Sequence, residues 1–220
     1  MNAASRPVRS AQRGPHRRLR ETVRRHLANP WRQPLLATAR DAFAPVVRAA
    51  ASGVPLWLDC GCGTGRSTAE LARLHPARLV VGIDRSAHRL GRAPACLPEN
   101  ALLVRMRVED AWRLAVEHAL EVERTLLLYP NPWPKPGHLK RRWHAHPAFA
   151  DLLAVGGEVE LRTNWRVFAE EFRIALDVAG VADAEVVSFR PDAPLTPFEA
   201  KYLASGHVLH RLSISLESQR

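Results

Sequence analysis

"VPLWLDCGCGTG" runs from Val54 to Gly65, and it is the stretch that decides the fold. Its first part, Val54–Cys60, is a short apolar run that predicts a buried strand, and three alternating glycines follow it. The next segment, Arg66–His75, has the leucine spacing of a helix. Glycines between a strand and a helix permit positive φ angles and let a ligand approach the backbone closely. The stretch therefore predicts a strand, a ligand-binding turn and a helix.

Strands and helices alternate along the rest of the chain. Short apolar runs predict the strands, and amphipathic stretches between them predict the helices. This alternation implies an α/β fold with a mainly parallel sheet that helices cover on both faces. A turn-rich insert separates the last two predicted strands. The other predicted strands are Arg78–Asp84, Leu102–Val108, Thr125–Tyr129, Glu158–Thr163, Ala184–Phe189 and His207–Ile214, and the other predicted helices are Ala111–Leu120, Leu139–Leu153 (interrupted at Pro147) and Trp165–Ala179.

The length and composition fit one domain with a well-buried core. The chain has 220 residues, 46% of them hydrophobic, and it contains no internal repeats or low-complexity segments. Its three cysteines are too few for a disulfide framework and indicate a reducing compartment, so we expect a cytoplasmic protein. No apolar run reaches the length of a membrane span. The sequence does not indicate an oligomeric state.

The charge is strongly positive and concentrated in arginine. A formal charge of +10 and a pI near 10.8 indicate a polyanionic partner, either nucleic acid or an anionic membrane surface. Residues 1–26 hold eight arginines and a single acid, Glu21, but no hydrophobic segment of the kind found in secretory signals. This composition resembles a transit peptide, but the segment continues directly into a helical pattern, which favours a mobile basic arm. We expect the arm and a first helix over residues 1–30, and one domain over residues 31–220.

Two acids distinguish the glycine turn from a dinucleotide-binding turn. Asp84 ends the second predicted strand, where a carboxylate can accept both ribose hydroxyls of a nucleoside. Asp59 opens the turn, where it would repel a pyrophosphate but attract the ammonium group of an amino acid. A nucleoside joined to an amino acid without phosphate describes S-adenosylmethionine, whose backbone contacts we expect at Gly61, Gly63 and Gly65. The alternative is a glycine-rich turn of another kind of α/β protein.

The pair Glu109–Asp110 follows the third strand, where adenine is usually contacted in this architecture. Asp110 also suits the N-cap of the next helix, and both interpretations are open. Cys60 and Cys62 form a C-x-C pair without matching histidine spacing, so we interpret them as small residues filling the turn and expect no structural metal. The two histidines in His144–His146 indicate an exposed helix surface or an RNA contact.

"YPNPWP", from Tyr129 to Pro134, follows the fourth strand. Ligands of such sheets bind beyond the carboxyl ends of the strands, so this turn should face the transferable methyl group. Its prolines stiffen the turn, Trp133 suits stacking on a base, and Asn131 suits a hydrogen bond to the cofactor or to the base edge. The alternative is a core tryptophan beside a solvated charged face. A predicted phosphate-binding ridge follows, made of Lys135, His138, Lys140, Arg141 and Arg142.

These motifs together resemble the bacterial tRNA (guanine-N7)-methyltransferase family. The resemblance covers residues 54–215 and rests on "DCGCGTG", "GIDRS", "EDA", "YPNPWPKPGHLKRR", "RTNW" and above all "TPFEAKYLASGHVLHRL". It implies a seven-stranded class I methyltransferase fold, Rossmann-like, with an antiparallel last strand, and an activity that methylates the variable-loop guanine of tRNA (tRNA position 46). By motif position it implies cofactor binding by Asp59, Asp84, Asp110 and Asn131, and substrate binding by Lys135, Asn164 and the segment Thr196–Glu199, which includes Phe198.

The sequence departs from the family pattern at two amides. Asn131, which we expect at the catalytic position, and Asn164 stand where the family has Asp. Guanine N7 carries an in-plane lone pair and no proton, so its methylation needs no strong base, but a carboxylate would stabilise the cationic product. Three alternatives therefore stay open: a diverged paralogue of low activity, an enzyme of the same fold that methylates an exocyclic amine, and an RNA-binding protein without catalysis.

Overall fold

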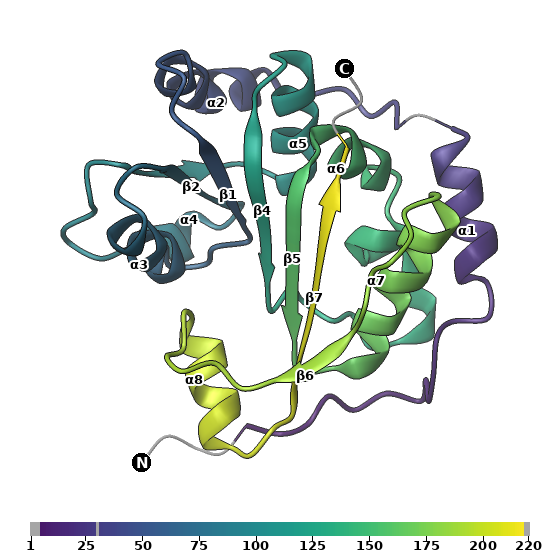
Figure 1. Cartoon of the computed structure of the whole chain (residues 1–220). Coiled ribbons are helices and arrows are strands. Elements are labelled where there is room, and N and C mark those ends of the chain that lie inside the picture. The colour runs from purple at the N-terminus through teal and green to yellow at the C-terminus, as the bar shows by residue number, and fades with distance from the viewer. Residues whose placement is uncertain (1–4, 30, 218–220) are drawn as a thin grey trace. The chain divides into compact units, whose positions relative to one another are not determined.

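The computed structural model describes residues 5–29 and 31–217. In these residues seven strands form one sheet in the order β3-β2-β1-β4-β5-β7-β6 (Figure 1). β1 pairs in parallel with β2 and β4, β2 pairs in parallel with β3, and β7 is antiparallel to β6. The predicted α/β fold is thus confirmed. The strands are β1 Leu56–Cys60, β2 Leu79–Asp84, β3 Ala101–Arg105, β4 Val122–Leu128, β5 Gly157–Thr163, β6 Val187–Phe189 and β7 Leu209–Leu216.

The helices differ more from the prediction than the strands do. The helix predicted over Leu139–Leu153 is wrong, because the segment forms two 3₁₀ turns and then a short α-helix. Pro136 begins the first 3₁₀ turn, and Pro147 precedes the α-helix, where its missing N–H prevents a continuous helix. The described helices are α1 Leu19–Leu27, α2 Ala37–Ala50, α3 Arg66–Leu74, α4 Ala87–Leu90, α5 Val108–Glu117, η1 Pro136–Arg141, η2 Trp143–Ala145, α6 Phe149–Val155, α7 Arg166–Val178 and α8 Pro197–Ala204.

Helices α2, α4 and α8 were not predicted. α2 contains Pro45 and has no side-chain cap at its start, so it lacks the usual sequence signals. α8 lies in the insert that we expected to be turns. Its signal was in the sequence, because Thr196 caps the helix, Pro197 follows at its first position and Glu199 stands three residues after the cap.

The chain divides into two compact units. The glycine-loop unit comprises Arg32–Leu128, Asp151–Val159 and Ser215–Arg220, and the arm unit comprises Met1–Trp31, Tyr129–Ala150 and Glu160–Ile214. All residues of β1 and β2 are buried, which fits central strands with both faces covered. The division into residues 1–30 and 31–220 stays a prediction, with residues 1–4, 30 and 218–220 outside the described residues.

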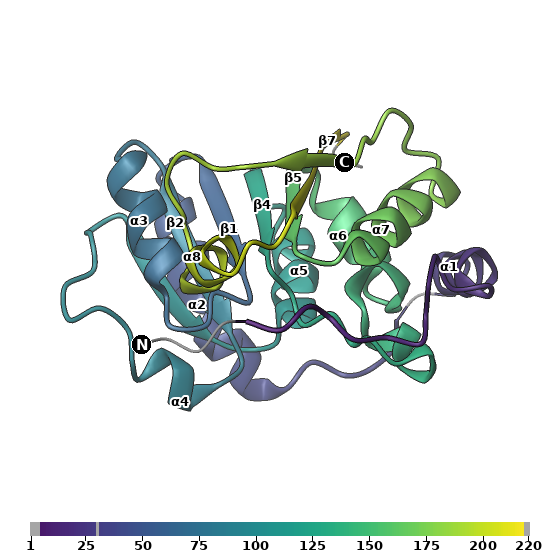
Figure 2. The same ribbon diagram turned by 90° about the horizontal axis from the view of Figure 1, so that it is seen from below.

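The basic arm is fastened to its own unit. Helix α1 lies beside α7, as Figures 1 and 2 both show, and Leu19 and Val23 of α1 are almost fully buried. The preceding segment is hydrogen-bonded to the unit through Ser10, Gln12 and His16. The expectation of a mobile arm is therefore wrong for residues 5–29. Composition showed the charge of the arm but not these neutral contacts.

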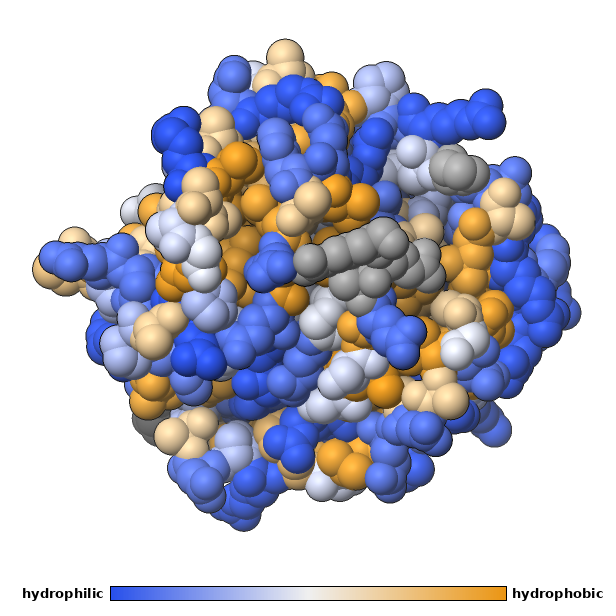
Figure 3. All heavy atoms as spheres, turned by 45° about the horizontal axis from the view of Figure 1, so that its top comes forward, coloured by the Kyte–Doolittle hydropathy of each residue, from blue (hydrophilic) through white to orange (hydrophobic). Residues whose placement is uncertain are grey.

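Hydrophilic side chains cover much of the face drawn in Figure 3, with hydrophobic ones between them. Of the helices that the structure describes, none is both long and apolar enough to cross a membrane.

We expect Gly82→Ala to destabilise the glycine-loop unit. A Cβ at Gly82 would lie 2.3 Å from Thr68 Oγ1 and 2.7 Å from Leu103 Cδ2, so α3 must move away from β2. Such overpacking costs about 1–3 kcal/mol, measurable by chemical denaturation. Gly14→Ala is the control, because a Cβ at Gly14 meets nothing within 4 Å. Equal stability of the two variants would contradict the close packing at Gly82.

Candidate functional site

The glycine turn is tied to the end of β2 by its own backbone. Gly61 N and Cys62 N donate to the Ile83 carbonyl at 2.7 and 3.1 Å, and Gly63 N donates to Asp84 Oδ2 at 3.0 Å. Gly61, Gly63 and Gly65 have φ angles of 78°, 62° and 71°, which only glycine adopts without strain. A Cβ at Gly63 would meet nothing within 4 Å, so the turn is open to a ligand at this residue.

Asp59 is fully buried and only half satisfied. Its Oδ2 accepts hydrogen bonds from Ser67 Oγ at 2.6 Å and Thr68 Oγ1 at 2.7 Å, which fixes the start of α3 against β1. Its Oδ1 is buried and has no partner among the described residues. Burial raises the pKa of Asp59, although the two hydroxyls oppose this. A buried acceptor without a donor is costly, so a ligand that donates there would stabilise the site.

Asp84 is almost fully buried at the end of β2, as predicted. Its Oδ1 accepts from Ser86 N at 2.8 Å and from Arg89 Nη2 at 2.9 Å, and its Oδ2 accepts from Gly63 N. Each carboxylate oxygen can accept more than one bond, so capacity is left for a ribose hydroxyl. Its predicted contact with a nucleoside stays a prediction, and the structure adds a second role in holding the glycine turn.

Asp110 is not an N-cap, which corrects one of its two interpretations. Helix α5 begins earlier than predicted, at Val108 after the N-cap Arg107, and Asp110 lies in its first turn. Burial raises the pKa of Asp110, and its Oδ1 has no partner in the described part of the chain. Since β1, β2 and β3 are parallel neighbours, Asp59, Asp84 and Asp110 stand at one edge of the sheet, at or just beyond the carboxyl ends of these strands.

Cys60 and Cys62 are buried, and burial raises the pKa of both thiols. No group of three or more histidine, cysteine or acidic side chains that could hold a metal occurs in residues 5–29 and 31–217.

The arm unit carries Asn131 and the turn around it. Asn131 Oδ1 accepts from Trp133 N at 3.2 Å, so the exposed side chain closes a turn over its own backbone. Trp133 has a positive φ of 45°. Its ring is partly exposed and lies between His138, edge-on at 5.5 Å, and the Arg141 guanidinium at 4.7 Å.

The predicted phosphate-binding ridge stays a prediction, and the structure shows which of its side chains are exposed. Lys135, Lys140 and Arg141 are exposed, and His138 is partly exposed. Arg142 does not belong to the ridge, because its side chain is buried and forms an ion pair with Glu171. The exposed surface expected at the "HAH" segment is also wrong for His144, which is buried. Arg141 is the last residue of the 3₁₀ turn η1 and Arg142 follows it, yet their surroundings differ, and the charge pattern alone could not distinguish them.

The predicted substrate segment lies at the start of α8. Thr196 Oγ1 accepts from Glu199 N at 2.9 Å and caps the helix, while Phe198 is exposed and stacks on Tyr202 with 6.2 Å between ring centroids. Glu199 is fully buried. Its carboxylate accepts hydrogen bonds from three donors, namely Tyr129 Oη at 2.7 Å, Arg162 Nη1 at 3.0 Å and Leu195 N at 2.6 Å.

The sequence reasoning missed Tyr129 and Arg162 as partners of Glu199. Both stand inside quoted motifs, at the start of "YPNPWP" and of "RTNW", and this position was the available signal. The substrate role of Glu199 stays a prediction, because in this structure its carboxylate accepts hydrogen bonds from other residues of the protein. Asn164 Nδ2 lies 3.0 Å from His207 Nδ1, so the amide donates to the histidine.

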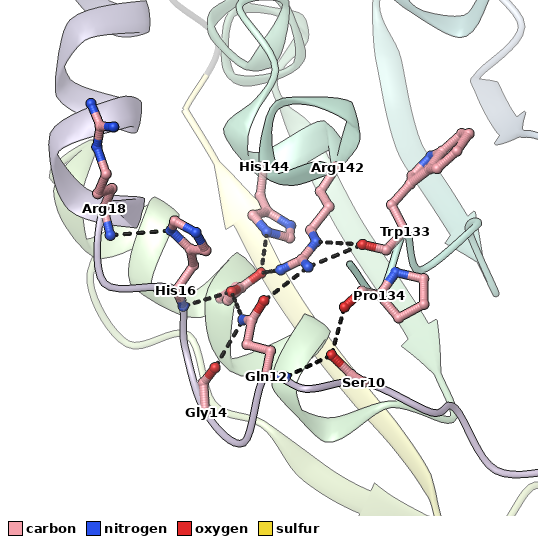
Figure 4. Close-up of polar contacts among 10 residues, drawn as sticks. Ser10, Gln12, Gly14, His16, Arg18, Trp133, Pro134, Arg142 and His144 are labelled. Atoms are coloured by element: carbon pink, nitrogen blue, oxygen red, sulfur yellow. Dashed lines mark hydrogen bonds and ion pairs between the residues drawn. The ribbon is translucent and has the colours of Figure 1, made fainter. Parts of the chain in front are cut away.

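A buried cluster around Glu171 joins the basic arm to the "YPNPWP" turn. Glu171 accepts hydrogen bonds from Gln12 Nε2 at 2.5 Å, His16 N at 2.8 Å, Arg142 and His144. Figure 4 shows Gln12, His16, Arg142 and His144 converging on this point. Burial opposes ionisation of Glu171, but the hydrogen bond from His144 and the charge of Arg142 outweigh it and lower the pKa to about 2. Burial lowers the pKa of His144.

Comparison with known proteins identifies the family. A family model described as "Putative methyltransferase" matches residues 54–212. The tRNA (guanine-N(7)-)-methyltransferase of Halorhodospira halophila is 33% identical over 174 residues, which cover 72% of this chain and 73% of the relative. The enzyme of the same name from Alkalilimnicola ehrlichii is 34% identical, with coverage of 73% and 72%.

This chain belongs to the tRNA (guanine-N7)-methyltransferase family. The resemblance inferred from the motifs is thereby confirmed.

Solved structures support the class I methyltransferase fold of this family member. The 16S rRNA methyltransferase KamB matches with a TM-score of 0.55 at 20% identity, covering 84% of this chain and 95% of KamB. The 16S rRNA (adenine(1408)-N(1))-methyltransferase of Catenulisporales acidiphilia, solved with SAM as cosubstrate, matches with a TM-score of 0.53 at 19% identity, covering 86% and 95%. At these identities the likeness concerns the fold alone.

Glu171→Gln should lower stability and flatten its dependence on pH. The folded-state pKa lies below the usual 4.5, so this carboxylate stabilises the fold fully above pH 4.5, and the contribution is lost as pH falls toward about 2. With Arg142 left buried without its counter-charge, the loss at pH 7 should be about 3–5 kcal/mol.

Urea unfolding at several pH values between 7 and 3 measures this effect. Glu170→Gln is the control, because Glu170 is the adjacent acid but pairs with partly or well exposed arginines at 3.3 and 3.5 Å. Its cost should stay below about 1 kcal/mol. Equal losses in the two variants would contradict the assignment.

Proposed function

We propose that this protein transfers the methyl group of S-adenosylmethionine to N7 of the variable-loop guanine of tRNA, in the cytoplasm. The observation that supports this proposal most is family membership, with 33% identity to a tRNA (guanine-N(7)-)-methyltransferase over 72% of the chain. Curated relatives with this same name share 29–34% identity with the chain.

The residues of the glycine-loop unit fit S-adenosylmethionine. Asp59 Oδ1, which has no partner among the described residues, is an acceptor for an ammonium group, and Asp84 keeps acceptor capacity for ribose hydroxyls. Asp110 Oδ1, which also lacks a partner in residues 5–29 and 31–217, is a further buried acceptor and suits the adenine amine. Three acids at one sheet edge disfavour a phosphate-bearing ligand, which supports this cofactor over a dinucleotide.

Methylation of N7 makes modest demands on the protein. When bound, the cofactor would supply an electrophilic methyl group on its sulfonium. The N7 lone pair would form a bond to the methyl carbon, and the sulfur would keep the electrons of the broken S–C bond. No proton leaves the guanine, so the protein needs no general base and acts by alignment. Asn131 would contribute a neutral dipole where the family pattern has a carboxylate.

The arm unit supplies groups suited to RNA. Lys135, Lys140 and Arg141 are exposed cations for phosphates, and Phe198 is an exposed aromatic ring for stacking on a base. Trp133 adds a partly exposed ring held beside Arg141. We propose that Asn164 and Thr196–Glu199 shape the substrate side, with Glu199 holding the segment and not contacting the base directly.

The decisive experiment is chain scission of treated tRNA. N7-methylguanosine is labile to reduction followed by aniline, so tRNA incubated with the protein and S-adenosylmethionine should break at the variable-loop guanine. Methylated product without scission would indicate an exocyclic amine as the target. Binding of tRNA with no methyl transfer would indicate the RNA-binding alternative.

Asp84→Ala should weaken S-adenosylmethionine binding by about 1–3 kcal/mol, because a charge-assisted contact to the ribose is lost. Calorimetry on the folded variant measures this. Asp41→Ala is the control, since Asp41 is an exposed acid of the same unit. Unchanged affinity in Asp84→Ala would remove Asp84 from the cofactor site.

Asn131→Asp should maintain or raise the rate of N7 methylation. A carboxylate oxygen can still accept from Trp133 N, so the turn is kept, and the new charge opposes the positive charge developing on the purine. In a partly desolvated site this is worth about 1–3 kcal/mol, or roughly tenfold to a hundredfold in rate. Single-turnover kinetics on unmodified tRNA measures it, with Asn131→Ala as the variant that loses the turn. A collapse of the rate in Asn131→Asp would favour an exocyclic amine, which needs the amide.

A further inference from the structure

The turn that carries Asn131 contains a strained residue. Trp133 has a φ of 45°, a region that bulky side chains rarely adopt. Such a conformation persists only where surrounding contacts hold it. The contacts at the Trp133 peptide therefore hold the turn in which Asn131 lies.

Arg142 holds the Trp133 carbonyl from inside the protein. Its Nε and Nη2 both donate to Trp133 O, at 3.3 and 3.0 Å. The guanidinium also lies 5.0 Å from the centroid of the Trp165 ring, and the residue is 1% exposed. A planar fork buried in this way has one orientation, so the carbonyl that it binds is fixed.

The basic arm completes the surroundings of Arg142. Gln12 Oε1 accepts from Arg142 Nη2 at 3.0 Å, and Gln12 Nε2 donates to Glu171 at 2.5 Å. His16 N donates to the same Glu171 oxygen at 2.8 Å. Gln12 thus bridges the two members of the buried ion pair, which Figure 4 shows.

A second contact from the arm reaches the turn directly. Ser10 Oγ donates to the Pro134 carbonyl at 2.5 Å and accepts from Gln12 N at 2.9 Å. Two successive carbonyls of the turn, those of Trp133 and Pro134, are therefore held by Arg142 and by Ser10. The groups of the arm that make these bonds are a hydroxyl, an amide and a backbone N–H, and none is charged.

We propose that Arg142 is a positioning residue for methyl transfer and that the segment Ser10–His16 is a strap that keeps it in place. The strap holds the strained backbone of Trp133 and so the position of Asn131. This inference rests on the proposed function, in which Asn131 stands at the reacting centre. It gives the arm a role through neutral hydrogen bonds, separate from attraction of its arginines to RNA.

Gln12→Ala tests the strap with the least damage to the fold. Gln12 is only partly buried, and the substitution changes no charge. We expect faster hydrogen exchange in the peptide covering residues 129–142 of the free protein, and a fall in kcat of about tenfold at saturating tRNA and S-adenosylmethionine. The affinity for S-adenosylmethionine and the salt dependence of tRNA binding should not change.

Two other variants serve as comparisons. Arg13→Ala removes an exposed charge from the same segment, so it should reduce the salt slope of tRNA binding by about one unit and leave exchange in residues 129–142 unchanged. Gln33→Ala removes an exposed glutamine whose backbone carbonyl, which the substitution keeps, accepts from Arg113 Nη1, so it should change neither quantity.

Arg142→Lys tests the positioning residue itself, because lysine keeps the charge but cannot donate two bonds to one carbonyl from a planar fork. We expect its kcat to fall at least as far as that of Gln12→Ala. In the double variant the two losses should not add, since both act through the Trp133 backbone. If Arg142→Lys does not fold, Gln12→Ala with its exchange measurement still decides the question.

The outcomes separate the two proposals. If tRNA treated with the wild-type protein breaks at the variable-loop guanine, but Gln12→Ala changes neither hydrogen exchange nor kcat, the strap is overturned and the proposed function is left intact. Loss of tRNA affinity in Gln12→Ala with unchanged kcat would overturn it too, in favour of a simple RNA contact. If wild-type protein gives no N7 product, the proposed function fails, and exchange in the free protein still shows whether the strap holds the turn.

Discussion

The buried ion pair between Glu171 and Arg142 organises the arm unit. Both side chains have no exposure, so each charge depends on its partner and on the hydrogen bonds around it. Helix α7 supplies Glu171, the segment before η2 supplies Arg142, and the basic arm supplies Gln12 and His16. Replacing such a pair by apolar residues is often neutral, so its value lies less in stability than in fixing orientation. The orientation fixed here is that of the Trp133 carbonyl.

The glycine-loop unit also buries charged groups, but there they are carboxylates without a buried arginine beside them in the described part of the chain. It places Asp59 and Asp84 at the ends of adjacent strands, where burial and, to a smaller extent, the nearby Asp84 raise the pKa of Asp59. Hydroxyls of α3 and the backbone N–H of Gly63 satisfy part of this charge. The part that stays unsatisfied, Asp59 Oδ1, is the part a cationic ligand would complete. The unsatisfied oxygen of Asp59 is thus the one available to a ligand, and the satisfied oxygen is the one that holds α3.

The sequence predicted the order of the strands along the chain and the glycine turn, because hydrophobic periodicity and turn chemistry are local properties. It also predicted where Asp59 and Asp84 stand, since both follow directly from strand ends. It failed where neighbours in space decide the outcome. Arg141 and Arg142 are adjacent residues of the same type, and the sequence does not distinguish them. Arg142 is nevertheless buried against Glu171, a residue 29 positions away, whereas Arg141 is exposed. The helix α8 was missed for a different reason, because its capping signal stood in a stretch rich in proline.

The two amides that depart from the family pattern fit this organisation. Asn131 closes its turn with Oδ1, a bond that needs an acceptor and no charge. Asn164 Nδ2 donates to His207 Nδ1, a bond that an ionised carboxylate cannot donate because it has no N–H. His207 Nε2 lies 3.0 Å from the carbonyl of Ser5, so a ring that carries a proton on Nε2 and a lone pair on Nδ1 satisfies both neighbours. The amide at Asn164 therefore matches the tautomer of His207 that donates to the arm at Ser5. The arm and the substitution of Asp by Asn at this position are linked through one ring, which gives the departure a structural reason independent of catalysis.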